Sequence, residues 1–227
     1  MTAHDKPTKM VLFGVGKVAA TLHYYLSRDR RYEVAAFTVD PPFVRAETLQ
    51  GLPVVPWDRV ADRYSPREYS MMIAVGFARA NRLRAERFAE AKALGYRLLS
   101  YVNPTAVIWD GFVLGENCRI GENVNVQPFT DIADNVFIGS GSIIGHHSTI
   151  GANCHLSSSV RVAGDVTVDP FCYIGSNATI RDGVRIAPSC VIGAGAVILG
   201  DTVANGVYMA KAADLLPITS ESLFSDR

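Results

Sequence analysis

From Ala106 to Asp201 the sequence divides into sixteen consecutive hexads, AVIWDG FVLGEN CRIGEN VNVQPF TDIADN VFIGSG SIIGHH STIGAN CHLSSS VRVAGD VTVDPF CYIGSN ATIRDG VRIAPS CVIGAG AVILGD. The third place of every hexad is Ile, Leu or Val, and the fourth is often Gly. A helix does not tolerate this pattern, because a period of six does not match about 3.6 residues per turn. A short period held this long predicts a solenoid, in which each repeat buries its apolar side only against its stacked neighbours.

The hexads resemble those of the hexapeptide-repeat acyltransferases, whose fold is a left-handed parallel β-helix. In that family three hexads form one triangular coil, so residues three hexads apart stack in a column. The hand comes from this resemblance alone, since the usual rule for parallel connections gives the opposite hand. We therefore expect a left-handed β-helix over residues 104–211.

The four cysteines offer a test of this stacking. They all hold the first place of a hexad, with spacings of 36, 18 and 18, and therefore fall in one column: Cys118, Cys154, Cys172 and Cys190. A metal or disulfide framework would favour close pairs such as C-x-x-C, and the sequence has none. A ladder of inward-facing free thiols agrees better with the small residues at this place and with a reducing cytosol.

Composition argues against several classes of protein. The chain has 227 residues, and its 22 Lys and Arg are balanced by 22 Asp and Glu, so no net field recruits nucleic acid or a membrane. No apolar run is long enough to span a bilayer, and no charged-then-apolar leader opens the chain. We expect a cytoplasmic protein with no nucleic-acid partner and no membrane insertion.

Residues 8–103 alternate short apolar runs with helical periodicity, which predicts a small Rossmann-like α/β unit. Residues 1–7 and 212–227 are expected to be tails. Expected strands cover residues 10–13, 33–39, 52–55, 69–75 and 97–99, and expected helices cover residues 17–26 and 78–94. The second helix carries Arg79, Arg82, Arg84 and Arg87 among Ala and Glu, which predicts a solvated face with salt-bridge partners.

The segment Gly14-Val-Gly16-Lys17-Val-Ala19 follows the first strand and matches the G-x-G-x-x-A dinucleotide fingerprint. Many such turns serve helix–strand packing alone, and a nicotinamide enzyme would add a second mononucleotide half where the solenoid begins. We therefore favour phosphate or sugar held by Gly14 and Gly16 at the helix N-terminus. Lys17 either contacts that phosphate or is solvated, and Asp40 is placed to accept hydrogen bonds from a ribose or sugar.

Two further features sharpen the resemblance: the junction Asn103-Pro104-Thr105-Ala106-Val107-Ile108 and the Gly145-His146 pair in mid-solenoid. The layout is similar to the sialic-acid O-acetyltransferase/nucleotide-sugar N-acetyltransferase family, which includes enzymes that acetylate UDP-, GDP- or dTDP-linked 4-amino-4,6-dideoxy sugars. This resemblance implies a homotrimer with three active sites between adjacent β-helices. It also implies that the α/β unit binds the nucleotide sugar and that acetyl-CoA lies along the groove between solenoids.

The same resemblance places the catalytic base at His146, and it matches His155 to a second family histidine near the acetyl group and the sugar. His147 stands where relatives often carry Glu or Asp. The group that orients His146 is therefore either His147 or Asp165, which lies one coil further along the same column. A zinc site of the β-helix carbonic anhydrase type would need paired histidines about five apart, so no metal is expected. Exposed corner histidines with no task remain the alternative.

For acetyl-CoA the resemblance implies contacts at Gly164, Ser176 and Ala194. Small residues there would let the pantetheine arm lie close to the backbone. Because Gly164 lies one coil above His146, we also expect its N–H to contact the oxyanion. Lys211 closes the segment Gly206-Val-Tyr208-Met-Ala210-Lys211, which resembles the family's final Gly-x-Pro-Ala-Lys without its proline. This lysine is expected to meet the CoA phosphates.

These observations together predict an acetyl-CoA-dependent N-acetyltransferase that acts on a nucleotide-linked amino-deoxy sugar. Direct transfer needs a base, an oxyanion donor and two ligands held face to face. Acetylation of a sugar hydroxyl is the alternative within the class. A non-catalytic trimeric binding scaffold is the alternative outside it.

Overall fold

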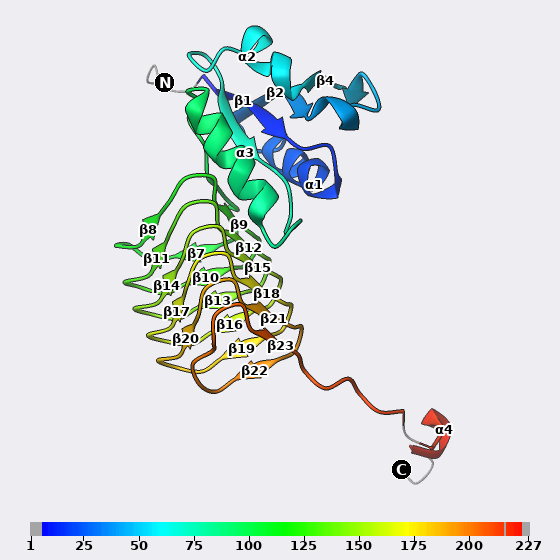
Figure 1. The fold of residues 1–227 in the computed structure, drawn as a ribbon, viewed down its shortest axis with the longest axis vertical. Helices are drawn as coiled ribbons and strands as arrows, with labels where there is room; N and C mark the ends of the chain where they lie inside the picture. Colours follow the sequence, from blue (N-terminus) through cyan, green and yellow to red (C-terminus); the bar gives the residue numbers. More distant parts are fainter. Residues whose placement is uncertain (1–5, 216, 224–227) are drawn as a thin grey trace.

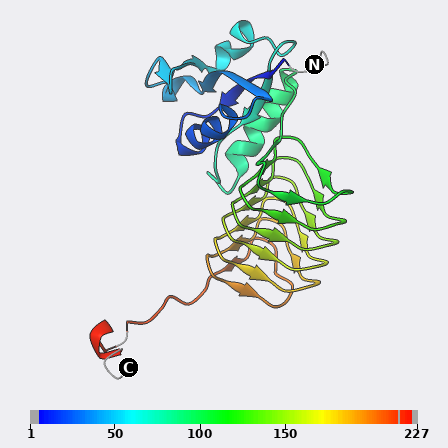
Figure 2. The same ribbon diagram turned by 180° about the vertical axis from the view of Figure 1, so that it is seen from behind.

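The computed structural model describes residues 6–215 and 217–223. The α/β unit lies at one end of a triangular prism of stacked coils, and the C-terminal tail leaves the other end (Figure 1). Figure 2 shows the same arrangement from behind. The tails expected at residues 1–7 and 212–227 lie partly outside the described residues.

The α/β unit is built on a five-stranded sheet in the order β3-β4-β2-β1-β5. Its strands are parallel except β3, which forms a hairpin with β4. The helices α1, α2 and α3 and two 3₁₀ segments join them. The bounds are β1 Thr8–Phe13, α1 Lys17–Leu26, β2 Tyr32–Val39, 3₁₀ Pro41–Phe43, β3 Thr48–Leu49, β4 Leu52–Pro56, 3₁₀ Trp57–Arg59, α2 Val60–Arg63, β5 Ser70–Ile73 and α3 Arg82–Ala93.

Two sequence expectations differ from this unit. The strand expected at residues 97–99 is reduced to a single bridge between Leu98 and Met71. The helix expected from residue 78 begins at Arg82, because the three preceding residues, Arg79, Ala80 and Asn81, have positive φ angles of 53°, 51° and 68°. A left-handed backbone cannot continue a right-handed helix.

The solenoid strands are two residues long and, from β7 to β22, occupy the second and third places of the hexads, as a β-helix requires. Each strand pairs in parallel with the strand one coil away, for example Asn125 with Ile143. The bounds are β6 Tyr101–Val102, β7 Val107–Ile108, β8 Val113–Leu114, β9 Arg119–Ile120, β10 Asn125–Val126, β11 Asp131–Ile132, β12 Phe137–Ile138, β13 Ile143–Ile144, β14 Thr149–Ile150, β15 His155–Leu156, β16 Arg161–Val162, β17 Thr167–Val168, β18 Tyr173–Ile174, β19 Thr179–Ile180, β20 Arg185–Ile186, β21 Val191–Ile192, β22 Val197–Ile198 and β23 Val207–Tyr208. A short helix, α4 Ser220–Leu223, lies in the tail.

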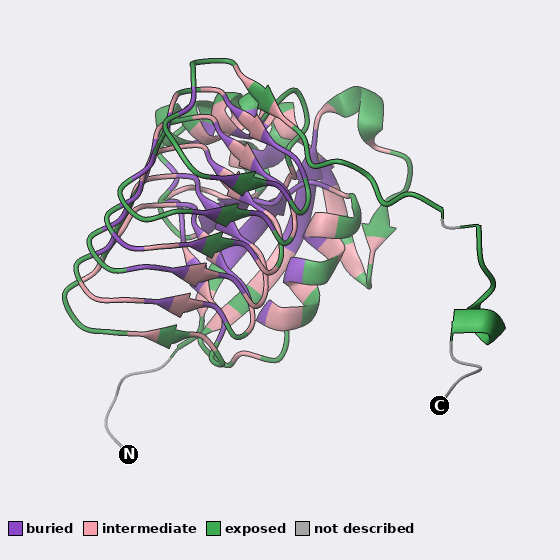
Figure 3. Ribbon diagram, turned by 90° about the horizontal axis from the view of Figure 1, so that it is seen from below, coloured by how far each residue is buried: buried purple, intermediate pink, exposed green. Residues whose placement is uncertain are grey.

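These strands form three sheets, which are the sides of the prism, and each is named after its first strand. The β6 side runs β6-β9-β12-β15-β18-β21-β23, the β7 side β7-β10-β13-β16-β19-β22, and the β8 side β8-β11-β14-β17-β20. From β9 onward the third-place residues are buried in the core of the prism (Figure 3). The second-place residues are half-buried or exposed, except Phe137, which packs into the core of the α/β unit. The expected fold, an α/β unit followed by a left-handed parallel β-helix, is confirmed.

The sixth place of the hexads explains much of the composition. From Asn117 to Gly195 every sixth-place residue has a positive φ, because the chain turns a corner there. Asn and Gly tolerate this conformation and are common at the place. Phe129, His147 and Phe171 occupy it too, with φ of 62°, 57° and 64°, although a bulky residue is strained there.

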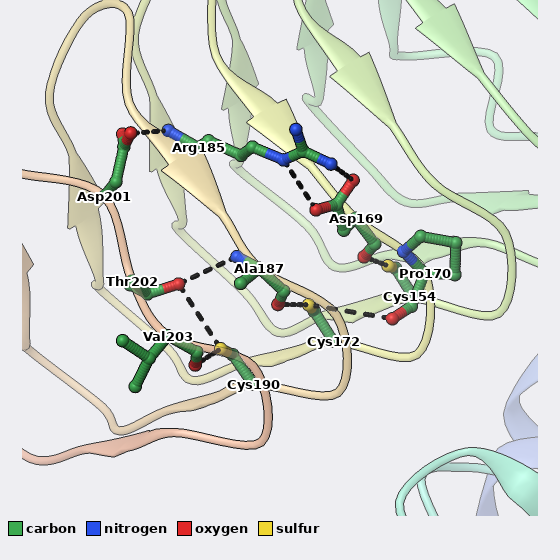
Figure 4. A network of polar contacts seen from close by, with 10 residues as sticks. All are labelled: Cys154, Asp169, Pro170, Cys172, Arg185, Ala187, Cys190, Asp201, Thr202 and Val203. Carbon is green, nitrogen blue, oxygen red and sulfur yellow. Dashed lines mark hydrogen bonds and ion pairs between the residues drawn. The ribbon is translucent and has the colours of Figure 1, made fainter.

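The predicted ladder of inward thiols is confirmed. All four cysteines are free and fully buried. Their thiols donate to backbone carbonyls of the next corner (Figure 4): Cys154 to Asp169 at 3.2 Å, Cys172 to Ala187 at 3.2 Å and Cys190 to Val203 at 3.1 Å. The column therefore fills the core and ties neighbouring coils together.

The prediction that α3 presents a solvated arginine face is wrong for Arg84, which is fully buried. Its guanidinium donates to Asn135 Oδ1 at 3.1 Å and to the carbonyls of Gly76 at 3.1 Å and Cys154 at 2.9 Å. It also lies 4.4 Å from the centroid of the Phe137 ring. Corner carbonyls of successive coils point at this helix, and a guanidinium has enough donors to satisfy several of them. Arg84 thereby joins the α/β unit to the solenoid.

Candidate functional site

The glycine turn lies where β1 ends and α1 begins, at the carboxyl edge of the parallel sheet. Gly14 has a φ of 121°, and a Cβ added to it would lie 2.8 Å from the carbonyl oxygen of Ala74. Its N–H donates to Thr38 O at 2.7 Å. Gly16 immediately precedes α1, whose first residue is Lys17. The turn therefore presents the helix N-terminus at the edge where α/β sheets bind ligands.

Asp40 lies at the same edge, after β2, but it is not free. Its carboxylate pairs with Arg87 of α3 at 3.0 Å, and Arg87 also pairs with Glu90. Two buried polar atoms beside this cluster, Thr38 Oγ1 and Arg87 Nε, have no hydrogen-bond partner within the described residues. Unsatisfied buried polar atoms suit a site that a polar ligand completes.

A pocket of about 300 Å³ lies between the α/β unit and the β6 side of the prism. Val18 of α1 and the Gly76-Phe77 segment form one wall. Outward residues of the β6 side and serines of the adjoining corner form the other: Arg119, Phe137, His155, Ser140, Ser157, Ser158 and Ser176. The pocket therefore contains His155 and Ser176, two of the residues expected from sequence, and Val18 places it next to Lys17.

His155 is held in this pocket by aromatic rings. Tyr173, one coil further, stacks on it at a centroid distance of 5.6 Å and an angle of 19°, and Phe77 meets its ring at 5.4 Å. Burial, and then the charges of Arg84 and Arg119, lower the pKa of His155 to about 3. Its Nδ1 atom is buried without a partner among the residues described. His155 is thus a neutral imidazole at neutral pH, and it can exchange hydrogen bonds with a ligand without carrying charge.

His146 and His147 lie at another place, the exposed corner between β13 and β14. Their Nδ1 atoms are 3.2 Å apart, and their rings are nearly perpendicular, at 83°. The backbone N–H of His146 donates to Gln127 Oε1 at 3.0 Å. Phe129, one coil earlier in the column, packs against the His147 ring with centroids 4.8 Å apart.

Gly164 and Asp165 follow one coil later in the same corner. The His146 ring lies against Gly164, since a Cβ added there would be 2.6 Å from His146 Cε1. The Gly164 N–H donates to Asp182 Oδ1 at 2.7 Å, so it is engaged within the chain, and its expected contact with the oxyanion stays a prediction. Asp165 donates its backbone N–H to His146 O at 2.8 Å. Among the described residues, its carboxylate makes no hydrogen bond or ion pair with either histidine.

One chain does not bring all the expected residues together. The corner of His146 joins the β7 and β8 sides, whereas His155 projects from the β6 side, which is the opposite side of the prism. Ser176 and Ala194 lie at the corner between the β6 and β7 sides. Lys211 lies beyond the last coil, where it pairs with Asp214 at 2.9 Å. A single subunit therefore holds two partial sites.

Sequence reasoning missed several residues around these sites. Phe129 precedes His147 by one coil and Asp182 follows Gly164 by one coil, so the column rule alone would have found them. Gln127 lies one position outside the column of His146, and its contact with the His146 N–H does not follow from that rule. Phe77 and Arg84 reach the site from another unit, and no local pattern signals their positions.

The family model described as bacterial transferase hexapeptide (six repeats) matches residues 129–164 and 165–200. Among solved structures, PerB from Caulobacter crescentus, in complex with CoA and GDP-perosamine, is similar with a TM-score of 0.80 at 27% identity, covering 92% of this chain and 97% of that one. The solenoid therefore carries the repeats of the bacterial hexapeptide transferases, and the chain is identified as an acyltransferase. A search of curated proteins finds no significant match.

Two further structures show the same fold for this acyltransferase. The acetyltransferase domain of PglB from Neisseria gonorrhoeae has a TM-score of 0.81 at 23% identity, covering 92% of this chain and 99% of that one. WeeI from Acinetobacter baumannii has a TM-score of 0.64 at 19% identity, covering 88% and 96%. These two structures support the fold alone; the resemblance expected from the hexads is confirmed by the family model and by PerB, and the site residues stay predictions.

Residues 6–215 and 217–223 contain no cluster of three or more His, Cys, Asp or Glu side chains that could hold a metal ion. Over the same residues, every helix is too short or too polar to cross a bilayer.

Proposed function

We propose that this acyltransferase moves the acetyl group of acetyl-CoA to the amino group of a nucleotide-linked amino-deoxy sugar, such as a 4-amino-4,6-dideoxy sugar. The observation that carries the proposal is the pocket between the α/β unit and the solenoid, with His155 inside it and the glycine turn beside it. Similarity to PerB, whose structure holds CoA and GDP-perosamine, supports both ligands.

The nucleotide sugar is assigned to the α/β side of this pocket. The N–H groups at the start of α1, after Gly14 and Gly16, favour a phosphate, and Lys17 adds a positive charge at the same point. Asp40, tied to Arg87, accepts hydrogen bonds from the ribose or sugar with its remaining lone pairs. The sugar then points toward His155, whose unpartnered Nδ1 is available to it.

His146 is assigned the role of general base. His146 Nε2 accepts the proton that the amine loses as its nitrogen attacks the thioester carbonyl carbon. The C–N bond forms, the C–S bond breaks, and the departing thiolate takes the same proton back from His146. One imidazole therefore balances the reaction without a covalent acyl-enzyme.

Two copies of the chain are needed for this assignment. His146 faces away from the pocket of its own subunit, so the pocket of a neighbouring subunit must lie against it. A closed ring of three copies, as in the expected homotrimer, repeats this contact three times with no unpaired end. Each active site then takes His146 from one subunit and His155 from the next.

Acetyl-CoA is assigned to the seam between these subunits. Ser176 and Ala194 offer a small-residue edge beside the pocket, and Gly164 lies against His146 on the facing subunit. Gly195 has open space where a Cβ would lie, whereas Gly193 is packed against Met209. Lys211 follows the last coil, and its ammonium group is assigned to the CoA phosphates.

The proposal is tested with purified protein, acetyl-CoA and a panel of nucleotide 4-amino sugars, with thiol release recorded. Release with amino sugars and not with the matching hydroxyl sugars supports it. Release with hydroxyl sugars alone identifies an O-acetyltransferase, and silence with every member of the panel favours a binding scaffold. His146→Ala should lower kcat by about a hundredfold or more and leave CoA binding within a few-fold.

A further inference from the structure

At the corner between β13 and β14, the imidazole rings of His146 and His147 approach each other with their Nδ1 atoms. His146 Nδ1 and His147 Nδ1 are 3.2 Å apart. Two nitrogens at this distance form a hydrogen bond only when one of them carries a proton and the other does not. The contact therefore couples the tautomers of the two rings, because the tautomer of one ring determines that of the other.

Only two neutral arrangements satisfy this contact. In the first, His146 Nδ1–H donates to His147 Nδ1, which leaves His146 Nε2 unprotonated and His147 protonated at Nε2. In the second, the donor and acceptor are exchanged, and His146 then carries its proton on Nε2 and has no free lone pair facing away from His147. The first arrangement alone makes His146 a base.

We propose that His147 is a positioning residue that accepts the Nδ1 proton of His146 and so holds His146 Nε2 as the proton acceptor of the reaction. The proposal rests on the proposed function, because it assigns the partner of the same base. It also decides between His147 and Asp165, since Asp165 reaches His146 through its backbone N–H.

Both rings are held by neighbours in the corner column. The His146 ring lies on Gly164, and its backbone N–H is fixed by Gln127. The backbone N–H of His147 donates to Pro128 O at 3.2 Å. Phe129 supports the other side of the His147 ring at 4.8 Å and an angle of 39°.

The conformation of Phe129 gives an independent indication that this stack is selected. Phe129 is 64% exposed and has a φ of 62°, so it combines an apolar surface in water with a strained backbone. Such a residue costs stability at a place where Asn or Gly is the easy choice. Its ring instead packs against the ring of His147, which in turn contacts His146.

The same contact stabilises His146 after it has accepted a proton from the substrate amine. Once Nε2 is protonated, His146 is an imidazolium, and its Nδ1–H makes a charge-assisted hydrogen bond to the neutral His147. His147 gains no proton and loses none. It stabilises the charged base through a neutral acceptor.

The test compares His147→Phe, which keeps a ring and removes the acceptor, with His147→Asn, whose Oδ1 restores an acceptor near the position of Nδ1. We expect His147→Phe to lower kcat by about tenfold to a hundredfold with the KM of both substrates within twofold, because the proposal assigns His147 no contact with either substrate. His147→Asn should recover most of the lost kcat. Nitrogen NMR of histidine-labelled wild-type protein should find the His146 proton on Nδ1.

Three results would overturn the proposal: full kcat in His147→Phe, a His146 proton on Nε2 in the wild type, or a kcat loss in Asp165→Asn as large as that in His147→Phe. Thermal unfolding of each variant checks that the corner still folds. The His146→Ala variant distinguishes an error in the assigned base from an error in the role of His147. Near-normal kcat in His146→Ala defeats the proposed base itself, whereas an inactive His146→Ala beside a fully active His147→Phe defeats only the role of His147.

Discussion

The His146 ring lies against Gly164, in space that a side chain at this position would fill. Adding one methyl group at residue 164 therefore tests the position of the ring. Gly164→Ala places a Cβ 2.6 Å from His146 Cε1, so the ring must shift. We expect kcat to fall by about tenfold to a hundredfold, because displacing a catalytic group by an ångström removes much of its effect. The control is Gly200→Ala, two coils further in the same column, where an added Cβ meets nothing within 4 Å. Equal kcat in both variants would contradict the placement of His146.

The sequence predicted which residues of this corner carry chemistry, but not how they face each other. A fixed period assigns His146, Gly164 and Asp182 to one column. It does not say that the ring of the first would cover the second, or that the third would capture the Gly164 N–H. Ring orientation and hydrogen-bond choice depend on distances of a few tenths of an ångström, which no residue pattern encodes.

Arg84 makes a buried polar contact between helix α3 and the solenoid. Arg84→Met removes the donor that the carbonyls of Gly76 and Asn135 accept from, at about 1–3 kcal/mol for each group. Asn135 Oδ1 and Cys154 O each lose one of two donors. We expect the free energy of unfolding to fall by about 3 kcal/mol or more in urea titrations. The matched control is Arg82→Met on the same helix, because Arg82 is exposed and its guanidinium lies over the ring of Phe171. A change below about 1 kcal/mol for Arg84→Met would show that the contact does not stabilise the junction.

The cysteine column gives a second test of an element. All four thiols are fully buried, and burial raises the pKa of Cys118 to about 11 and that of Cys154 well above its usual range. Reactivity requires an accessible thiolate. We expect no labelling by a disulfide reagent in native protein and complete labelling in guanidinium chloride. Rapid labelling of any cysteine in the native state would contradict its place inside the prism.

The elements differ in how far the sequence predicts them. The solenoid strands follow from the hexads, because each residue's direction is set by its place in a period of six. The burial of Arg84 does not follow, since it results from corner carbonyls of separate coils meeting one guanidinium. The Ala and Glu residues around it in the sequence are typical of an exposed helix.

The protein as a whole is expected to lose stability in acid through His155. Its pKa of about 3 in the folded state lies below the ordinary value of about 6.5 for an unfolded chain. Between these values the unfolded state binds one more proton, so the free energy of unfolding decreases as pH falls through this window. Urea titrations at pH 7, 5 and 4 measure this slope. His155→Phe should flatten it, and an unchanged slope would show that other groups cause the acid sensitivity.

The assembly decides whether the two partial sites of each chain ever meet. If each active site takes His146 from one subunit and His155 from the next, His146→Ala and His155→Ala proteins are each inactive. Unfolding them together and refolding the mixture creates seams in which both histidines are intact. In a closed trimer of equal random composition, about a quarter of the seams are of this kind, because each of the two contributing subunits is correct half of the time. We expect the mixture to recover about a quarter of wild-type kcat, while each variant refolded alone recovers none. A mixture that stays inactive, although it forms trimers as large as the wild type, would mean that both histidines of a site come from one chain or that they serve different steps.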